Sequence, residues 1–211
     1  MNIFLKLLVI ISIIFLNSCS KKEEKISMIQ EKNQEINIIS REIFQKQNIR
    51  ERHIIDSAQI IDFVDFNSNT TTDLGSGSGM PGIVVAIILK NTKNNMKVHL
   101  YEKSYHKSSF LRQVVRKLKL DVQIFEKDIF KEENLISGSI IARAFKPLPI
   151  ILELVEKSFK NYTNLIVFMG KNGKQLIEEA FKNCEFEYKE KKSLTSNDSF
   201  LINIKNITPK L

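Results

Sequence analysis

One acidic residue and four glycines lie close together near the middle of the chain. They occur in the stretch Thr72-Asp-Leu-Gly-Ser-Gly-Ser-Gly-Met-Pro-Gly82. Glycine has no Cβ atom, so a loop built from it turns sharply and lets the backbone come close to a ligand. An apolar run follows from Ile83. Gly82 is therefore expected to open a helix whose first N–H groups lack partners and face the ligand. The chemistry that this pattern suits is the binding of a nucleotide.

The glycine spacing is compatible with more than one kind of nucleotide. The dinucleotide fingerprint Gly-x-Gly-x-x-Gly fails when it is read from Gly75, because its third glycine falls on Met80, but it is met when it is read from Gly77. That second frame leaves Asp73 and Gly75 without a role. A phosphate loop of the Walker type needs Gly-Lys-Ser/Thr, which this stretch lacks. The pattern that uses every residue is Asp-x-Gly-x-Gly-x-Gly.

These residues need a strand before the loop and a helix behind it. We expect a first strand to end at Asp73, because open α/β sheets bind ligands at the carboxyl ends of their strands. Residues 96–102 alternate like a second strand, which ends in Glu102. A carboxylate about 20 residues past the glycines is placed to accept hydrogen bonds from ribose hydroxyls. The alternative for Glu102 is a solvated charge at a strand end.

The rest of the chain continues the alternation of strands and helices. Further strands are expected at 121–126, 138–145 and 165–169, and helices at 104–119, from Pro147 to about residue 160, and at 173–183. Two alternating runs at 184–189 and 200–204 suit a closing antiparallel pair. The pattern predicts an α/β sheet with helices on both faces.

The segment 103–119 carries six Lys or Arg side chains and no acid. Its apolar residues fall at helical spacing and predict a buried face, which leaves Lys107, Arg112 and Arg116 on the outward sides. A face of one charge sign beside a nucleotide loop is a candidate for contact with nucleic-acid phosphates. The alternative is an ordinary solvated helix face.

Composition sets wider limits. The chain has 211 residues, 43% of them hydrophobic, which is enough for one domain with a full core. The net charge of +8 favours an anionic partner such as nucleic acid. The two cysteines, Cys19 and Cys184, are far apart and match no metal spacing, so we expect no metal.

The first 27 residues differ from the rest. An apolar run from Leu7 to Leu16 is followed by Leu16-Asn-Ser-Cys19, which resembles a bacterial lipoprotein cleavage box. The run is too short for an ordinary membrane span and suits a signal peptide. Three interpretations stay open: a wrongly assigned start with Met28 as the real one, an apolar first helix of the domain, or a lipoprotein acylated at Cys19.

Residues 28–66 are expected to form helices ahead of a main domain at 67–211. The second of these helices contains Arg52-His-Ile-Ile-Asp-Ser57, and Arg52, Asp56 and Gln59 share one helical face by their spacing. His53 is a candidate for contact with substrate. The alternative for His53 is a surface histidine without a chemical role.

Three of these motifs together resemble one protein family. Asp73 to Gly82 resembles motif I of the S-adenosylmethionine methyltransferases, and in its longer form is similar to the RsmG family (older name GidB), guanine-N7 methyltransferases of small-subunit ribosomal RNA. Arg52 to Ser57 resembles that family's Arg-His-Ile-Leu-Asp-Ser, and Ala142-Arg-Ala-Phe145 its Ser-Arg-Ala-Phe. The chain departs from the family at Lys32, where Trp is usual, and at Gly170-Lys171, where the order is reversed.

The resemblance covers roughly residues 29–205 and implies a class I, Rossmann-like methyltransferase fold with an N-terminal helical extension. It implies S-adenosylmethionine as cofactor and 16S ribosomal RNA or the small subunit as partner of a monomeric, cytoplasmic enzyme. It places the cofactor shell at Asp73, Gly75, Gly77, Met80, Glu102, Asp128, Ile129 and Arg143. The candidates for RNA contact are Arg52, His53, Lys107, Arg112 and Arg116.

A guanine N7 carries a lone pair and no proton at neutral pH, so the implied reaction needs orientation and no general base. Two other functions stay open. One is a membrane-tethered lipoprotein whose methyltransferase-like domain only binds, which the cleavage box favours and the intact glycine motif disfavours. The other is a methyltransferase for small molecules, which predicts no affinity for RNA.

Overall fold

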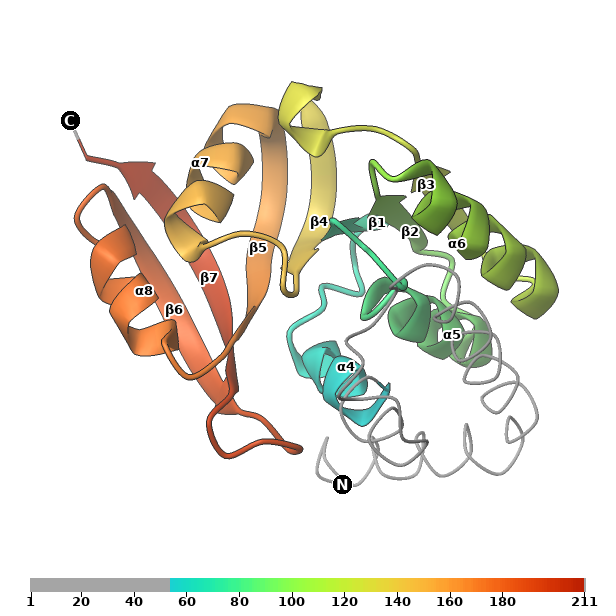
Figure 1. The fold of residues 1–211 in the computed structure, drawn as a ribbon, viewed down its shortest axis with the longest axis horizontal. Helices are drawn as coiled ribbons and strands as arrows, with labels where there is room; N and C mark the ends of the chain where they lie inside the picture. The colour runs from blue at the N-terminus through green and yellow to red at the C-terminus, as the bar shows by residue number, and fades with distance from the viewer. Residues whose placement is uncertain (1–53, 211) are drawn as a thin grey trace.

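The apolar runs form the strands of one mixed sheet. The computed structural model describes residues 54–210, and within them seven strands lie in the order β3-β2-β1-β4-β5-β7-β6 (Figure 1). Their bounds are β1 Thr70–Leu74, β2 Lys97–Tyr101, β3 Val122–Phe125, β4 Leu135–Ala142, β5 Phe159–Met169, β6 Cys184–Lys192 and β7 Phe200–Pro209. Strands β1 to β5 pair in parallel, and β7 is antiparallel to both β5 and β6.

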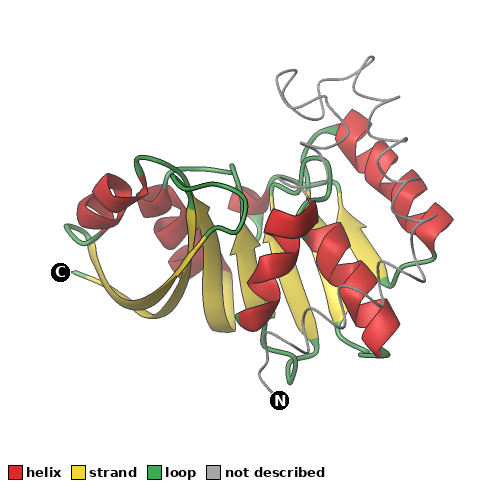
Figure 2. Ribbon diagram, turned by 90° about the horizontal axis from the view of Figure 1, so that it is seen from below, coloured by secondary structure: helices red, strands yellow, loops and turns green. Residues whose placement is uncertain are grey.

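Helices cover both faces of this sheet (Figure 2). Helices α5 and α6, with the short α4, contribute to one hydrophobic core, and α7 and α8 contribute to the other. Their bounds are α4 Asp56–Ala58, α5 Gly82–Thr92, α6 Tyr105–Leu118, α7 Leu148–Ser158 and α8 Gly173–Ala180, with the 3-10 turns η3 Gln59–Asp62 and η4 Ile129–Lys131. The predicted α/β sheet with helices on both faces is confirmed.

The strand order reverses direction at the centre of the sheet. From β1 the chain moves outward through β2 and β3, then returns to place β4 on the other side of β1. In open α/β sheets a ligand crevice forms at such a switch point, outside the carboxyl ends of the strands. The loops that follow β1, β2, β3 and β4 therefore meet at one edge of the sheet.

Two strands begin earlier than the sequence pattern predicted. β4 begins at Leu135, three residues before the expected start, and β5 begins at Phe159, where the prediction still had helix. The extra residues pair with each other, since Leu135 lies opposite Phe159 and Ser137 opposite Tyr162. The early parts of both strands contain polar residues, so a prediction based on apolar runs missed them. Pairing between the two strands stabilises these residues.

The predicted amino-terminal segments fall largely outside the described residues. Residues 1–27 lie wholly outside them, and of the expected helical region 28–66 the structure describes only the part from Ile54. Within the described part, no helix is both long enough and apolar enough to cross a membrane.

Candidate functional site

The glycine loop after β1 adopts a conformation that most other residues resist. Gly75, Gly77 and Gly79 have φ angles of 62°, 54° and 85°, in the left-handed region that favours glycine. At Gly82 the limit is space, because a Cβ atom there would lie 2.3 Å from Leu100 and 2.7 Å from the Asp73 carboxylate. The alternating glycines are thus explained by the backbone that this loop requires.

Asp73 supports the loop from behind. Its side chain is buried, and its Oδ2 accepts a hydrogen bond of 2.9 Å from the N–H of Gly82. The next three N–H groups of α5 donate to the carbonyls of Gly79 and Pro81. The expectation that the first N–H groups of this helix face a ligand is therefore wrong. The loop folds back so that its own oxygen atoms satisfy them, which disfavours a bound pyrophosphate and with it the dinucleotide alternative.

Glu102 stands just after β2 and is held at both carboxylate oxygens. Oε2 accepts a hydrogen bond of 3.0 Å from the N–H of Gly77, and Oε1 accepts one of 2.8 Å from the N–H of Ser104. The residue is 7% exposed. Each oxygen keeps a second lone pair, so a fixed carboxylate of this kind can also accept hydrogen bonds from a neighbouring diol.

A cavity of about 270 Å³ lies between these loops. It is lined by Gly75, Tyr101, Glu102, Lys103, Lys127, Asp128, Ile129, Phe130, Ala144, Phe145 and Lys146. We call it the nucleoside cavity. Asp128 caps η4 by accepting a hydrogen bond of 3.3 Å from the N–H of Phe130, and Ile129 is buried beside it.

The walls of the nucleoside cavity combine polar and apolar groups. Glu102 and Asp128 offer carboxylate acceptors, and Ile129 offers an apolar surface. Four of the eight predicted cofactor residues line this cavity, namely Gly75, Glu102, Asp128 and Ile129. Gly77 is not among the lining residues, but its N–H donates a hydrogen bond to Glu102.

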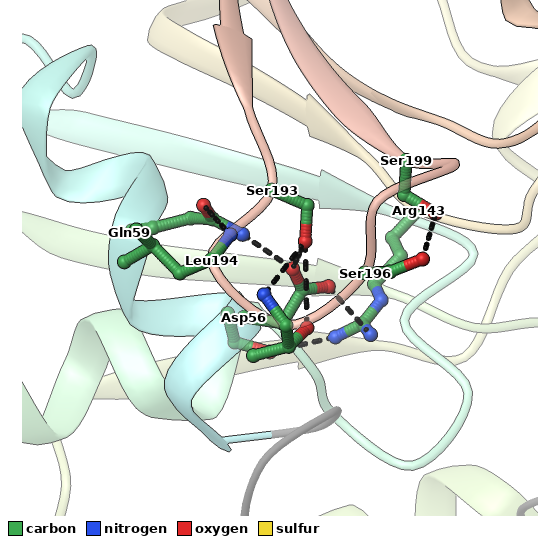
Figure 3. A network of polar contacts seen from close by, with 9 residues as sticks. Asp56, Gln59, Arg143, Ser193, Leu194, Ser196 and Ser199 are labelled. Carbon is green, nitrogen blue, oxygen red and sulfur yellow. Dashed lines mark hydrogen bonds and ion pairs between the residues drawn. The ribbon is translucent and has the colours of Figure 1, made fainter.

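Three other predicted cofactor residues lie elsewhere. Asp73 and Met80 are buried behind the loop, Met80 within the hydrophobic core of the α5 and α6 face. The Arg143 guanidinium pairs with Asp56 at 2.9 Å and donates to Ser57 Oγ at 2.9 Å (Figure 3). It also lies 5.0 Å from the centre of the Phe168 ring. These contacts make Arg143 an arginine paired with a neighbouring acid, in place of the expected cofactor contact.

The partner of Arg143 belongs to a larger polar network (Figure 3). The second oxygen of Asp56 accepts hydrogen bonds from Gln59 Nε2 and from Ser193 Oγ, the latter at 2.9 Å. Gln59 Oε1 in turn accepts from the N–H of Leu194 at 3.1 Å. The network joins α4 and η3, the end of β4 and the loop between β6 and β7.

The basic helix α6 lies as the sequence predicted, with its apolar residues buried and its charged side chains outward. Lys107 is half-buried and Arg116 is exposed. Arg112 forms an ion pair of 2.8 Å with Glu126, with 44% of its own side chain exposed. The other two candidates for RNA contact, Arg52 and His53, lie outside the described residues. In the part that is described, no cluster of three or more potential metal-ligating side chains occurs.

Sequence reasoning missed the aromatic residues of this site. Phe130 and Phe145 line the nucleoside cavity and stack with their ring centres 5.9 Å apart. Phe130 directly follows Ile129, and Phe145 lies two residues after Arg143, both of which were singled out. Their positions after the ends of β3 and β4 were the available signal.

Comparison with known proteins places this geometry in a family. The model of the family GidB, described as rRNA small subunit methyltransferase G, matches residues 18–202. A protein of that name from Pelagibacter ubique is 63% identical over 185 residues, which cover 88% of this chain and 87% of the relative. Another from Dinoroseobacter shibae is 32% identical over 155 residues, covering 73% of this chain and 79% of the relative.

A solved structure supports the fold independently. A SAM-dependent methyltransferase from Aquifex aeolicus superimposes with a TM-score of 0.55 at 12% identity, covering 76% of this chain and 93% of that one. At this identity the likeness shows the fold alone, and it confirms the predicted class I, Rossmann-like architecture. With the family model matching most of its length, the chain belongs to the rRNA small subunit methyltransferase G family.

Proposed function

We propose that this chain transfers a methyl group from S-adenosylmethionine to N7 of a guanine in 16S ribosomal RNA. The single observation that carries the proposal is the Glu102 carboxylate, fixed by two backbone amides at the wall of the nucleoside cavity in a chain of this family. A relative that is 63% identical over 185 residues carries the name of a small-subunit ribosomal RNA methyltransferase.

The nucleoside cavity would hold the adenosyl part of the cofactor. Glu102 would accept hydrogen bonds from the ribose hydroxyls, and Asp128 and Ile129 would border the adenine. Gly75 lets the backbone approach the ligand without a side chain between them. Asp73 and Met80 would act from behind, by keeping the loop in place.

The bound cofactor supplies a methyl group on a positively charged sulfur, and the chain's own residues supply position and a dry environment. N7 of guanine carries a free lone pair, so no side chain has to remove a proton. Holding the two reactants in line is worth up to ~7–11 kcal/mol. We therefore assign no general base, and we assign Arg143 to a positioning role through Asp56.

The outward face of α6 would contact the RNA backbone. Lys107, Arg112 and Arg116 are positive side chains of this helix, which begins three residues after Glu102. Phosphate contacts of this kind position an RNA without reading its sequence. The substrate implies the cytoplasm as the place of action, and we propose a monomer.

Methyl transfer from labelled S-adenosylmethionine tests the proposal. Purified protein is incubated with naked 16S RNA and, in a second arm, with assembled small subunits that lack the modification. Label in either RNA, and less of it with the Glu102→Gln variant at the same limiting cofactor concentration, supports the proposal. If the protein binds the cofactor but labels neither RNA, the small-molecule alternative takes its place. If it binds no cofactor, the chain is the non-catalytic module instead.

A further inference from the structure

A single short segment separates the nucleoside cavity from a second cavity. The second cavity, of about 300 Å³, opens between the carboxyl ends of β4 and β5, with apolar walls that include Leu148 and Ile151 of α7. We call it the apolar cavity. Three consecutive residues, Ala144, Phe145 and Lys146, line both cavities. This segment is therefore a wall that the two cavities share.

The Phe145 ring is the largest apolar part of that wall, and it lies against the first glycine of the loop. A Cβ atom at Gly75 would be 2.3 Å from Cδ2 and 2.8 Å from Cε2 of this ring. The ring therefore covers Gly75 on the side that a side chain would occupy. It does so within the cavity that also contains Glu102 and Asp128.

The ring is only partly enclosed. Phe145 is half-buried and packs against the hydrophobic core of the α7 and α8 face, while its aromatic partner, Phe130, is itself 37% exposed. The residue before it, Ala144, has a φ of 47°, a left-handed conformation that is strained for a residue with a Cβ atom. Strain of this kind concentrates in segments that change conformation at functional sites. A half-buried ring beside a strained residue suits a segment that changes conformation.

We propose that Phe145 is a movable partition, displaced when a nucleoside cofactor enters its cavity, and that its displacement opens the apolar cavity to the purine that receives the methyl group. The inference rests on the proposed function. Transfer requires the two reacting atoms to come within about 3–3.5 Å, with no ring between them. A wall shared by the two cavities has to open for this contact. The apolar cavity offers flat apolar surface to the incoming base.

A tryptophan at this position reports a change in the surroundings of the ring. The chain contains no tryptophan, so Phe145→Trp carries a single one, whose emission can be excited apart from that of the four tyrosines. S-adenosylhomocysteine, which cannot donate a methyl group, is the probe. We expect the emission to shift as the probe binds, with the same saturation that calorimetry gives. Tyr188→Trp, on β6 and outside the lining of both cavities, is the matched control and should not respond. A constant Phe145→Trp emission at saturating probe overturns the proposal.

The sign of an affinity change gives a second test. Phe145→Ala removes the ring that has to be displaced, so S-adenosylhomocysteine should bind about 2- to 10-fold more tightly, the equivalent of one aromatic pair. If the ring is a fixed wall that contacts the cofactor, the same variant binds more weakly. Equal or weaker binding therefore counts against the partition. Both tests measure binding, so they stand apart from the transfer assay: a wild type that binds the probe but methylates no RNA refutes the proposed function alone.

Discussion

Replacing Glu102 with glutamine tests the centre of the cofactor site with the least change of shape. The carboxylate accepts one hydrogen bond at each oxygen, from the N–H of Gly77 and from the N–H of Ser104. In Glu102→Gln one oxygen becomes an NH2 group, which donates and cannot accept. One backbone N–H then loses its hydrogen-bond acceptor, and a ribose hydroxyl loses a charged acceptor.

The magnitude follows from these contacts. A hydrogen bond to a charged group contributes about 1.5–3 kcal/mol. Loss of the one made to the ribose should weaken the binding of S-adenosylhomocysteine roughly 10- to 150-fold. The orphaned N–H should separately lower the free energy of unfolding by about 1–3 kcal/mol. Calorimetric titration measures the first quantity and urea unfolding the second.

A matched control separates the site from its surroundings. Glu156→Gln changes a carboxylate that accepts a hydrogen bond of 3.3 Å from the Tyr162 hydroxyl and lines neither cavity. We expect its affinity for the probe to match that of the wild type. The reasoning is refuted if Glu102→Gln binds S-adenosylhomocysteine as tightly as the wild type, whatever happens to its stability.

Four further predictions follow from other parts of the molecule. Changing Arg112 and Arg116 together to Glu should weaken binding to 16S RNA and flatten its salt dependence by roughly one to two counterions, with cofactor affinity unchanged. Filter binding at several salt concentrations measures both RNA quantities. If the double variant binds RNA normally, the outward face of α6 is only a solvated face. Asp56→Ala should lower the free energy of unfolding in urea by about 3 kcal/mol, because it leaves a largely buried guanidinium without its acid, and a loss below about 1 kcal/mol would contradict this. The pKa of His99 lies below its ordinary value of 6.5, first because burial disfavours the charged ring and second because Lys97 repels it. Because the unfolded chain binds more protons, the free energy of unfolding should fall as the pH drops from about 6.5 through the lower folded pKa. Between about pH 7.5 and pH 5.5, the free energy of unfolding of the His99→Gln variant should fall less than that of the wild type. A chain that begins at Met28 should bind S-adenosylhomocysteine like the full chain, since every predicted site residue lies beyond it; an unfolded product would show instead that the apolar run belongs to the core.

The sequence predicted most reliably what depends on neighbours along the chain. The glycine loop has a left-handed backbone at alternate positions, and glycine is the residue type that this conformation favours. Glu102 was recognisable from its place at the end of an alternating strand. The fold class follows from the alternation of apolar runs.

Contacts between distant segments were beyond that reasoning. Arg143 was expected at the cofactor, and the structure pairs it with Asp56 and Ser57, which precede it by more than a third of the chain. No local pattern in the sequence records such a pair. Gly75 shows the same limit: the pattern predicted close approach to a ligand, whereas the structure also places the Phe145 ring against it. A Gly75→Val variant would disturb both, so it cannot serve as a clean test of cofactor binding.

Nucleoside analysis of the methylated RNA tests the central claim most directly. Small-subunit RNA that has been incubated with the purified protein and isotope-labelled S-adenosylmethionine is digested, and its nucleosides are separated by mass spectrometry. The proposed function predicts that the label resides in 7-methylguanosine, at no more than one equivalent per RNA, and that the Glu102→Gln variant gives less of it at limiting cofactor. Label in any other nucleoside, or an RNA without label beside a protein that binds the cofactor, would contradict the claim.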